Sequence, residues 1–217
     1  MIPSNSLPWQ AKTWQTQLSG AVTQVQDLAQ ILGLSDNVED WDADPTFPMR
    51  VPMPYISRMN HGDPRDPLLR QVMPQLAERI DAVGFASAPL LEASTAPIPG
   101  LLHKYQGRVL VVAAEHCAVN CRYCFRREFS YAKHRHDTTF PMLDYVRDDA
   151  SIREVILSGG DPLIMPDERL YKLVASIEAI PHVKRLRIHT RLPVVIPQRV
   201  CRPLHRPQPR RPLLDGV

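Results

Sequence analysis

The sequence predicts an α/β fold with parallel strands, and three segments carry this prediction. A continuous apolar run of six residues follows Arg108, a second predicted strand begins at Glu154 with EVIL, and a third predicted strand is RLRIHTR at residues 185–191. Continuous apolar runs are typical of strands that are buried on both faces of a sheet. A helical stretch over residues 167–180 separates the last two, and strand, helix, strand at this spacing favours a parallel sheet or barrel.

The region before these strands is predicted to be helical, with irregular connectors. Apolar residues recur at spacings of three and four through residues 9–33, which is typical of an amphipathic helix that ends at Gly33. An Asp- and Pro-rich stretch over residues 35–66 predicts a connector with short helical pieces, and a second helix is expected over residues 68–80. The apolar residues of the first helix are Trp14, Leu18, Val22, Val25, Leu28 and Leu32.

These patterns divide the chain into three parts. Residues 1–100 are expected to form the helical region and connector, and residues 101–200 the core that carries the strands. Residues 201–217 are rich in Arg and Pro, which suit neither a helix nor a buried strand. This tail is therefore not expected to continue the fold, and it looks like the product of a frameshift or a truncation.

Overall charge and hydropathy exclude several classes of protein. The chain has 26 Lys and Arg against 23 Asp and Glu, a formal charge of +3. This near balance gives no field that would favour nucleic acid, so a small molecule is the expected partner. The N-terminus lacks a basic start followed by an apolar run, and no stretch of 18 apolar residues occurs. We therefore expect no signal peptide, no membrane association and a cytoplasmic location.

Three of the four cysteines form a C-x3-C-x2-C pattern: Cys117, Cys121 and Cys124. They fall within eight positions, too close together for an ordinary disulfide framework in a chain without an export signal. Three thiolates on a short loop suit three corners of a [4Fe-4S] cluster and leave the fourth iron without a protein ligand. S-adenosylmethionine can bind such an open iron, and its reductive cleavage yields a 5′-deoxyadenosyl radical that abstracts hydrogen.

Other interpretations of this region stay open. A structural zinc site is the weaker one, because such sites usually repeat a C-x2-C pair or add two histidines, although His116, His134 and His136 are nearby. Tyr123, beside the third cysteine, either shields the cluster, packs on adenine, or simply packs within the loop. Cys201 has a spacing that fits no ligand set, and no role is expected for it.

A Gly-Gly-Asp-Pro turn ends the second predicted strand, at residues 159–162. Working loops of parallel α/β folds lie at the carboxyl ends of the strands, so this turn and the cysteines are expected on one face. Paired glycines let the backbone approach a ligand, here the methionine end of S-adenosylmethionine, although such a turn by itself is commonly only a tight turn. The residues expected to bind S-adenosylmethionine are Tyr123, Ser158, Gly159, Gly160, Asp161, His189 and Arg191.

At HKYQGRVLVVAAEHCAVNCRYCFRR, LSGGDPL and IPHVKRLRIHTRLPVVIPQRV, the sequence resembles the lysine 2,3-aminomutase family of radical S-adenosylmethionine enzymes. The resemblance implies a partial (βα) barrel and an isomerase that moves the α-amino group of L-lysine to the β-carbon. It implies pyridoxal 5′-phosphate as a further cofactor and a reducing electron donor. Among members of the family, the likeness is greatest to those whose (R)-β-lysine is passed to a ligase that modifies elongation factor P.

The resemblance also implies roles for individual residues. The three cysteines match the cluster ligands, Tyr105 and Arg108 match a Y-x2-R pair near pyridoxal phosphate, and Arg126 matches an arginine that faces the substrate carboxylate. A guanidinium group forms bidentate pairs with carboxylates, although Arg126 is equally compatible with a solvated loop arginine, like its neighbours Arg122 and Arg127.

The family pattern continues beyond IPQRV with the rest of the barrel, the lysine that holds pyridoxal phosphate, and the acidic residues that hold the substrate ammonium. We therefore expect a barrel that is incomplete at the C-terminus. Activity would also require a lysine that forms a Schiff base with pyridoxal phosphate, and Lys104, Lys133, Lys172 and Lys184 match no family position. Two alternatives remain open. One is a protein that cleaves S-adenosylmethionine without pyridoxal phosphate, and the other is a non-catalytic metal-binding fragment.

Overall fold

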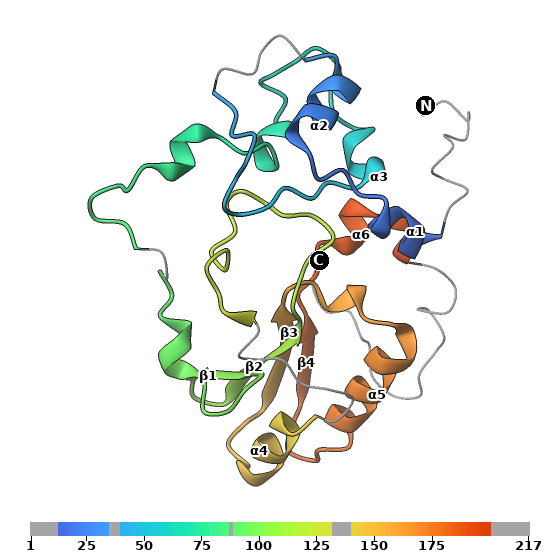
Figure 1. Cartoon of the computed structure of the whole chain (residues 1–217). Helices are drawn as coiled ribbons and strands as arrows, with labels where there is room; N and C mark the ends of the chain where they lie inside the picture. The colour runs from blue at the N-terminus through green and yellow to red at the C-terminus, as the bar shows by residue number, and fades with distance from the viewer. Residues whose placement is uncertain (1–12, 35–39, 87–88, 132–139, 201–217) are drawn as a thin grey trace. The chain divides into compact units, whose positions relative to one another are not determined.

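The computed structural model describes residues 13–34, 40–86, 89–131 and 140–200, which form two compact units (Figure 1). The first unit combines the N-terminal residues up to Ala86 with Ala118–Arg127 and Pro193–Arg199, and the second combines Ser87–Cys117 with Glu128–Leu192. The cysteine loop is thus divided between the units, which a boundary at residue 100 does not anticipate. Outside the described residues lie the tail with Cys201, and Lys133, His134 and His136.

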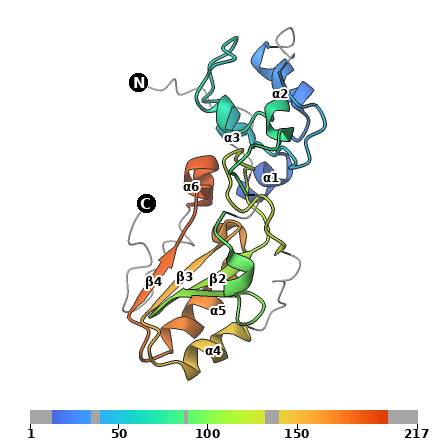
Figure 2. The same ribbon diagram turned by 90° about the vertical axis from the view of Figure 1, so that its left-hand side faces the viewer.

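The second unit is built on a four-stranded sheet (Figures 1 and 2). Its order is β1 (Leu101–Tyr105), β2 (Arg108–Ala114), β3 (Glu154–Gly159) and β4 (Arg185–Ile188). The β2–β3 and β3–β4 pairs are parallel, as the sequence predicts. The sequence did not indicate β1, which is antiparallel to β2 and makes the sheet mixed. The α/β class is confirmed, whereas the barrel stays a prediction.

Two crossover helices cover one face of this sheet. The helix α4 (Met142–Asp148) lies between β2 and β3 in sequence, and α5 (Asp167–Glu178) lies between β3 and β4. Both connections advance in the same direction along the sheet, so right-handed crossovers place both helices on one face. Strand and helix side chains that are at most 4% exposed form this core: Val109, Val111, Val155, Leu157, Met142, Leu143, Val146, Leu170, Leu173, Val174 and Ile177.

The first unit begins with two short helices in place of the single predicted one. The helix α1 (Trp14–Ser19) ends at Gly20, and α2 (Val25–Leu32) follows after a break. Within the break, Val22 forms an antiparallel bridge with Val51, and a β-branched residue is well suited to that extended conformation. Gly33 caps α2 in the left-handed conformation with φ 68°, as the sequence predicts.

Pro74 explains why the second predicted helix is also interrupted. The structure has two short 3-10 turns, η1 (Leu69–Gln71) and η2 (Leu76–Arg79), on either side of it. Proline lacks the backbone N–H that an internal helical residue donates. The predicted connector contains the short helix α3 (Met53–Ile56). The remaining elements are η3 (Glu92–Thr95), η5 (Pro162–Ile164), α6 (Leu192–Val195) and η6 (Pro197–Arg199).

Residues near the end of the described chain join the first unit through arginine contacts. The buried guanidinium of Arg199 lies over the ring of Trp14, with 4.5 Å between its central carbon and the ring centroid. Arg58 donates a hydrogen bond to the carbonyl oxygen of Val194. A cation over a desolvated indole ring is a favourable contact, and it fastens η6 onto α1.

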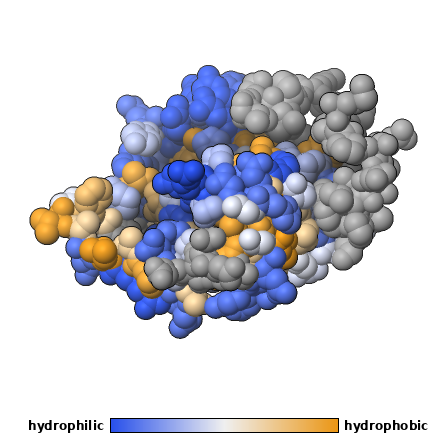
Figure 3. Space-filling model, turned by 90° about the horizontal axis from the view of Figure 1, so that it is seen from above, coloured by the Kyte–Doolittle hydropathy of each residue, from blue (hydrophilic) through white to orange (hydrophobic). Residues whose placement is uncertain are grey.

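An exposed apolar segment extends from the first unit. Ile80, Val83 and Phe85 are 72–101% exposed, and hydrophobic residues of this segment project at the left of Figure 3. They bury almost no surface, so the stability of the unit depends on other residues. Among the described residues, no helix is both long and apolar enough to cross a membrane.

The fold predicts that Leu173→Ala destabilises the second unit. Leu173 is fully buried on α5, and truncation of such a leucine costs about 2–5 kcal/mol in the free energy of unfolding. Urea unfolding followed by circular dichroism measures the loss. The control is Glu168→Ala on the same helix, which removes only an exposed ion pair with Lys172 and should cost less than about 0.5 kcal/mol. Equal effects of the two substitutions would contradict the packing described.

Candidate functional site

The cysteine loop starts just after β2 and contains three thiols. Cys117, Cys121 and Cys124 are half-buried, and none forms a disulfide. The N–H of Cys124 donates to the carbonyl oxygen of Cys121, and the N–H of Arg127 donates to that of Cys124. The second and third cysteines therefore bracket one tight turn, and a second turn follows directly.

The donor set fits an iron-sulfur cluster chemically. Such a cluster attaches each thiolate to a different iron atom, and the loop supplies three separate thiols. Within the part of the chain that the structure describes, no group of three or more His, Cys, Asp or Glu side chains is gathered around a single ion position. The residues that would hold the cluster are Cys117, Cys121 and Cys124.

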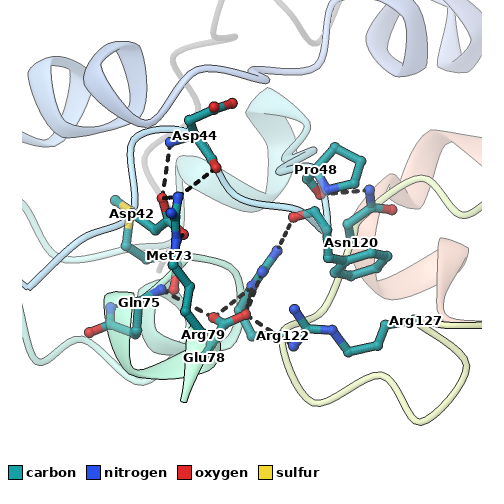
Figure 4. Close-up of polar contacts among 11 residues, drawn as sticks. Asp42, Asp44, Pro48, Met73, Gln75, Glu78, Arg79, Asn120, Arg122 and Arg127 are labelled. Carbon is teal, nitrogen blue, oxygen red and sulfur yellow. Dashed lines mark hydrogen bonds and ion pairs between the residues drawn. The ribbon is translucent and has the colours of Figure 1, made fainter. Parts of the chain in front are cut away.

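In the first unit, backbone carbonyl oxygens accept hydrogen bonds from N–H groups of the cysteine loop. Asn120 donates its N–H to the carbonyl oxygen of Arg50 at 3.1 Å, and Arg122 donates its N–H to that of Gln71 at 2.8 Å. The side-chain amide of Asn120 donates to the carbonyl oxygen of Pro48 at 2.9 Å (Figure 4). The segment from residue 120 to 122 is therefore held along its backbone.

Glu78 holds two arginines of the same loop (Figure 4). Its carboxylate accepts a bidentate contact from Arg122, with Nε to Oε1 at 2.9 Å, and an ion pair from Arg127 at 3.0 Å. Arg122 also donates from Nη1 to the carbonyl oxygen of Phe47 at 2.8 Å, and its guanidinium lies over the ring of Phe47. Arg122 is not the solvated loop arginine that the sequence suggested, because its side chain is only 8% exposed.

These cations change the ionisation of Glu78. Burial by itself would raise the pKa of this carboxyl, but the hydrogen bonds and charges of Arg122 and Arg127, with the N–H of Gln75, lower the pKa below its ordinary value. Glu78 is therefore a carboxylate near neutral pH. Sequence analysis missed this residue because 44 positions separate it from Arg122, and no local pattern joins them.

In the second unit, the paired glycines bring two backbone segments together. The N–H of Gly160 donates to the carbonyl oxygen of Ala114, and that of Asp161 donates to the carbonyl oxygen of His116. A Cβ atom on Gly160 would lie 2.6 Å from the backbone nitrogen of His116, and Gly159 has φ 97°. The lack of a side chain at Gly160 thus permits a close approach to the segment that leads into Cys117. The role of both glycines toward S-adenosylmethionine stays a prediction.

Asp161 joins the ends of β3 and β4. Its buried carboxylate accepts hydrogen bonds from the hydroxyl of Thr190 at 2.6 Å and from the backbone N–H groups of Arg191 and Leu192 at 2.7 and 2.8 Å. A further bond comes from the N–H of Leu163 at 3.0 Å. The carboxylate of Asp161 thus accepts four hydrogen bonds from the protein itself.

The other residues expected to bind S-adenosylmethionine lie at separate points. Ser158 is buried at the end of β3, and His189 is exposed just after β4. The backbone of His189 donates to the carbonyl oxygen of Leu157. Tyr123 belongs to the first unit, where its hydroxyl donates to Oε1 of Gln71 at 3.3 Å. The roles of these residues toward S-adenosylmethionine stay predictions.

Tyr105 and Arg108 flank the two-residue turn between β1 and β2. They line a pocket of about 160 Å³ with Lys104, with Glu92 and Thr95 of η3, and with apolar residues, a volume below the roughly 300–1,000 Å³ typical of small-molecule sites. Arg108 is at the amino end of β2, whereas Cys117 follows its carboxyl end. At about 3.3 Å per residue, the strand separates these ends by roughly 20 Å.

The buried carboxylate of Glu154 fixes Arg108 at that amino end. Glu154 also pairs with Arg187 at 2.8 Å and with Arg185 at 3.5 Å. Three arginines around one carboxylate leave a local excess of positive charge. In the first unit, Arg126 is buried, and its guanidinium lies 4.6 Å from the centroid of the Phe125 ring. Its role toward a substrate carboxylate stays a prediction.

The fold and the thiol loop define an α/β protein with the ligand pattern of an iron-sulfur cluster. In agreement, residues 105–190 match the family model of a 4Fe-4S single cluster domain. The chain is 45% identical to the L-lysine 2,3-aminomutase of Escherichia coli K12 over 88% of its length, and 43% identical to that of Haemophilus influenzae over 92%. The corresponding identity to the enzyme of Clostridium subterminale is 35% over 86%.

Over most of its own length the chain is thus similar to these L-lysine 2,3-aminomutases. It spans 57% of the Escherichia coli relative, 60% of the Haemophilus influenzae relative and 46% of the Clostridium subterminale relative. The part that matches contains the whole cysteine loop and the four strands.

The hydrogen bonds of Asp161 predict that Asp161→Ala severely destabilises the second unit. Hydrogen bonds to a charged group contribute roughly 1.5–3 kcal/mol each, so we expect a loss of at least about 3 kcal/mol. Urea unfolding measures it. Asp149→Ala is the control, because the half-buried carboxylate of Asp149 accepts hydrogen bonds from Ser151 of its own turn and interacts with His103 and His182 only through charge. A loss below about 1 kcal/mol for Asp161→Ala would refute the joining role, since even one such bond contributes more.

The contacts of Gly160 predict that Gly160→Ala displaces the segment before Cys117. The added methyl group would overlap the backbone of His116, and neither backbone can move without losing strand pairing. We expect a lower melting temperature and faster hydrogen exchange at residues 114–117. Gly62 has open space around it and a positive φ of 72°, which Gly160 does not have, so Gly62→Ala should show only a conformational cost. Similar exchange rates at residues 114–117 in both variants would contradict the overlap.

Proposed function

We propose that the chain provides the cluster-binding part of a radical S-adenosylmethionine enzyme that converts L-lysine to (R)-β-lysine. The observation that carries this proposal is the loop with Cys117, Cys121 and Cys124, which lies within the match to the 4Fe-4S domain. The three relatives described above are L-lysine 2,3-aminomutases, which supports the proposed substrate and reaction.

In this proposal the three thiolates hold the cluster and leave one iron for S-adenosylmethionine. A bound, reduced [4Fe-4S] cluster supplies the electron that cleaves S-adenosylmethionine into methionine and the radical that abstracts hydrogen from the substrate. Asp161 and Gly160 keep the backbone before Cys117 in place. Arg126 receives the carboxylate of lysine, because a guanidinium group can bind both of its oxygens.

The remaining expected residues complete the proposal. Tyr105 and Arg108 contribute to binding pyridoxal 5′-phosphate. The residues that contact S-adenosylmethionine are Tyr123, Ser158, Gly159, Gly160, Asp161, His189 and Arg191. The excess of positive charge around Glu154 supports an anionic group near Arg108. The product would serve the lysyl ligase that modifies elongation factor P. The three thiols are consistent with action in the cytoplasm, where cysteines stay reduced, and with an electron donor of that compartment.

Reconstitution with iron and sulfide under anaerobic conditions tests this function. The reduced protein should release 5′-deoxyadenosine from S-adenosylmethionine, and Cys121→Ala should abolish the release. Adding L-lysine and pyridoxal phosphate then tests for β-lysine.

The products distinguish the two alternatives. Release of 5′-deoxyadenosine without β-lysine, and without the absorbance of bound pyridoxal, would favour cleavage that is independent of pyridoxal phosphate. A protein that forms neither a cluster nor 5′-deoxyadenosine would be a non-catalytic member of the family.

A further inference from the structure

Two arginines belong to the two successive turns that carry the second and third cysteines. Arg122 lies within the first turn, directly after Cys121, and Arg127 ends the second turn, three positions after Cys124. Both arginines contact the same carboxylate, that of Glu78, which lies in η2 of the first unit. A single side chain therefore joins the two turns, as Figure 4 shows for Glu78, Arg122 and Arg127.

The burial of this contact distinguishes it from an ordinary surface ion pair. The side chains of Arg122 and Glu78 are 8% and 18% exposed, and that of Arg127 is 22% exposed. Exposed pairs contribute little to stability. Buried pairs are costly to desolvate, so their value often lies in selecting one conformation. The bidentate geometry of Arg122 restricts both the direction and the rotation of its guanidinium group.

The carboxylate is itself held in place. The N–H of Gln75 donates to Oε1 of Glu78 at 3.1 Å, which forms a capping box at the start of η2. Gln71, in η1, accepts the N–H of Arg122. The loop thus has a backbone anchor and a side-chain anchor, one on each of the two 3-10 turns around Pro74.

The charges around the cysteine turn follow from the same contacts. Arg122 and Arg127 contribute two positive charges, and Glu78 contributes one negative charge. Reduction of an iron-sulfur cluster adds an electron, so a more positive surrounding raises the reduction potential. Removal of the Glu78 charge would therefore shift the potential upward, apart from any effect on the shape of the loop.

We propose that Glu78 is a positioning residue for the cluster ligands Cys121 and Cys124, which it orients through Arg122 and Arg127. The proposal also assigns to Glu78 part of the control of the cluster potential. It rests on the cluster-binding half of the proposed function and is independent of lysine and of pyridoxal phosphate. The alternative is that Glu78 merely stabilises η2 through its cap.

The neighbouring pair of Asp42 and Arg79 provides a matched control. Arg79 follows Glu78 in η2 and makes a bidentate contact with Asp42, at 2.6 Å for both nitrogen atoms. Asp42→Asn therefore removes a carboxylate that is bound to the same turn through Arg79 and that acts on Arg122 of the cysteine loop only through its charge. If Glu78 acted only by stabilising η2, Asp42→Asn and Glu78→Gln would have the same consequences.

The first measurement uses the apo protein. Under reducing conditions, the alkylation rate of each cysteine by iodoacetamide is followed by mass spectrometry. We expect Glu78→Gln to raise the rates of Cys121 and Cys124 at least threefold and to leave Cys117, which belongs to the second unit, unchanged. Asp42→Asn should leave all three rates unchanged, even if it lowers the melting temperature. A uniform increase at all three cysteines, or no increase, would overturn the positioning role.

The second measurement uses protein reconstituted with iron and sulfide. Bound iron and the midpoint potential, from a redox titration followed by electron paramagnetic resonance, are compared between variants. We expect Glu78→Gln to retain less than half of the iron and to have a more positive potential. Glu78→Asp keeps the charge but is one methylene shorter, so it should alter alkylation while its potential stays near that of the parent. A parental potential in Glu78→Gln would overturn the electrostatic part.

The two proposals can fail separately. If the parent protein forms no cluster, the proposed function fails, but the alkylation rates still decide whether Glu78 positions the two cysteines. If the parent forms a cluster and cleaves S-adenosylmethionine while Glu78→Gln matches it in all readings, the positioning role fails and the proposed function stands.

Discussion

In the second unit, the arrangement depends on the close contact between the turn after β3 and the segment after β2. Gly160 lies against the backbone of His116 without room for a side chain. Asp161 then extends the contact to Thr190 and to the backbone that follows β4. The carboxyl ends of three parallel strands are thereby joined through one short motif. Since Cys117 follows His116 directly, the start of the cysteine loop takes its position from this contact.

The rest of the loop takes its position from the first unit. Arg122 donates its backbone N–H to Gln71 and its side chain to Glu78. Cys117 is thus positioned by contacts within the second unit, whereas Cys121 and Cys124 are positioned by contacts within the first unit. Both sets of contacts use carboxylates that accept several donors, which gives direction as well as attraction. A loop that must present three thiolates to one cluster benefits from such restriction, because its own backbone forms only tight turns.

Charge is distributed differently at the two ends of the sheet. At the amino end, Glu154 is surrounded by Arg108, Arg185 and Arg187, and positive charge is in excess. At the carboxyl end, the carboxylate of Asp161 accepts hydrogen bonds from one hydroxyl and three backbone N–H groups, which are uncharged donors. An anionic cofactor is therefore better matched to the amino end. This agrees with the proposed role of Arg108, although the pocket beside it is small.

The sequence by itself determined the parallel strands, the C-x3-C-x2-C loop and the cap at Gly33, because these depend on local periodicity and spacing. The resemblance to the lysine 2,3-aminomutase family came instead from three longer motifs. The sequence did not determine β1, whose pairing requires β2, or the breaks at Gly20 and Pro74, where one residue overrides a helical pattern. It did not indicate what Gly160 packs against or which residue pairs with Arg122. Only the tertiary structure decided that Gly160 packs on His116 and that Arg122 binds Glu78. These contacts join residues that are more than forty positions apart, and such pairs meet only when the chain has folded.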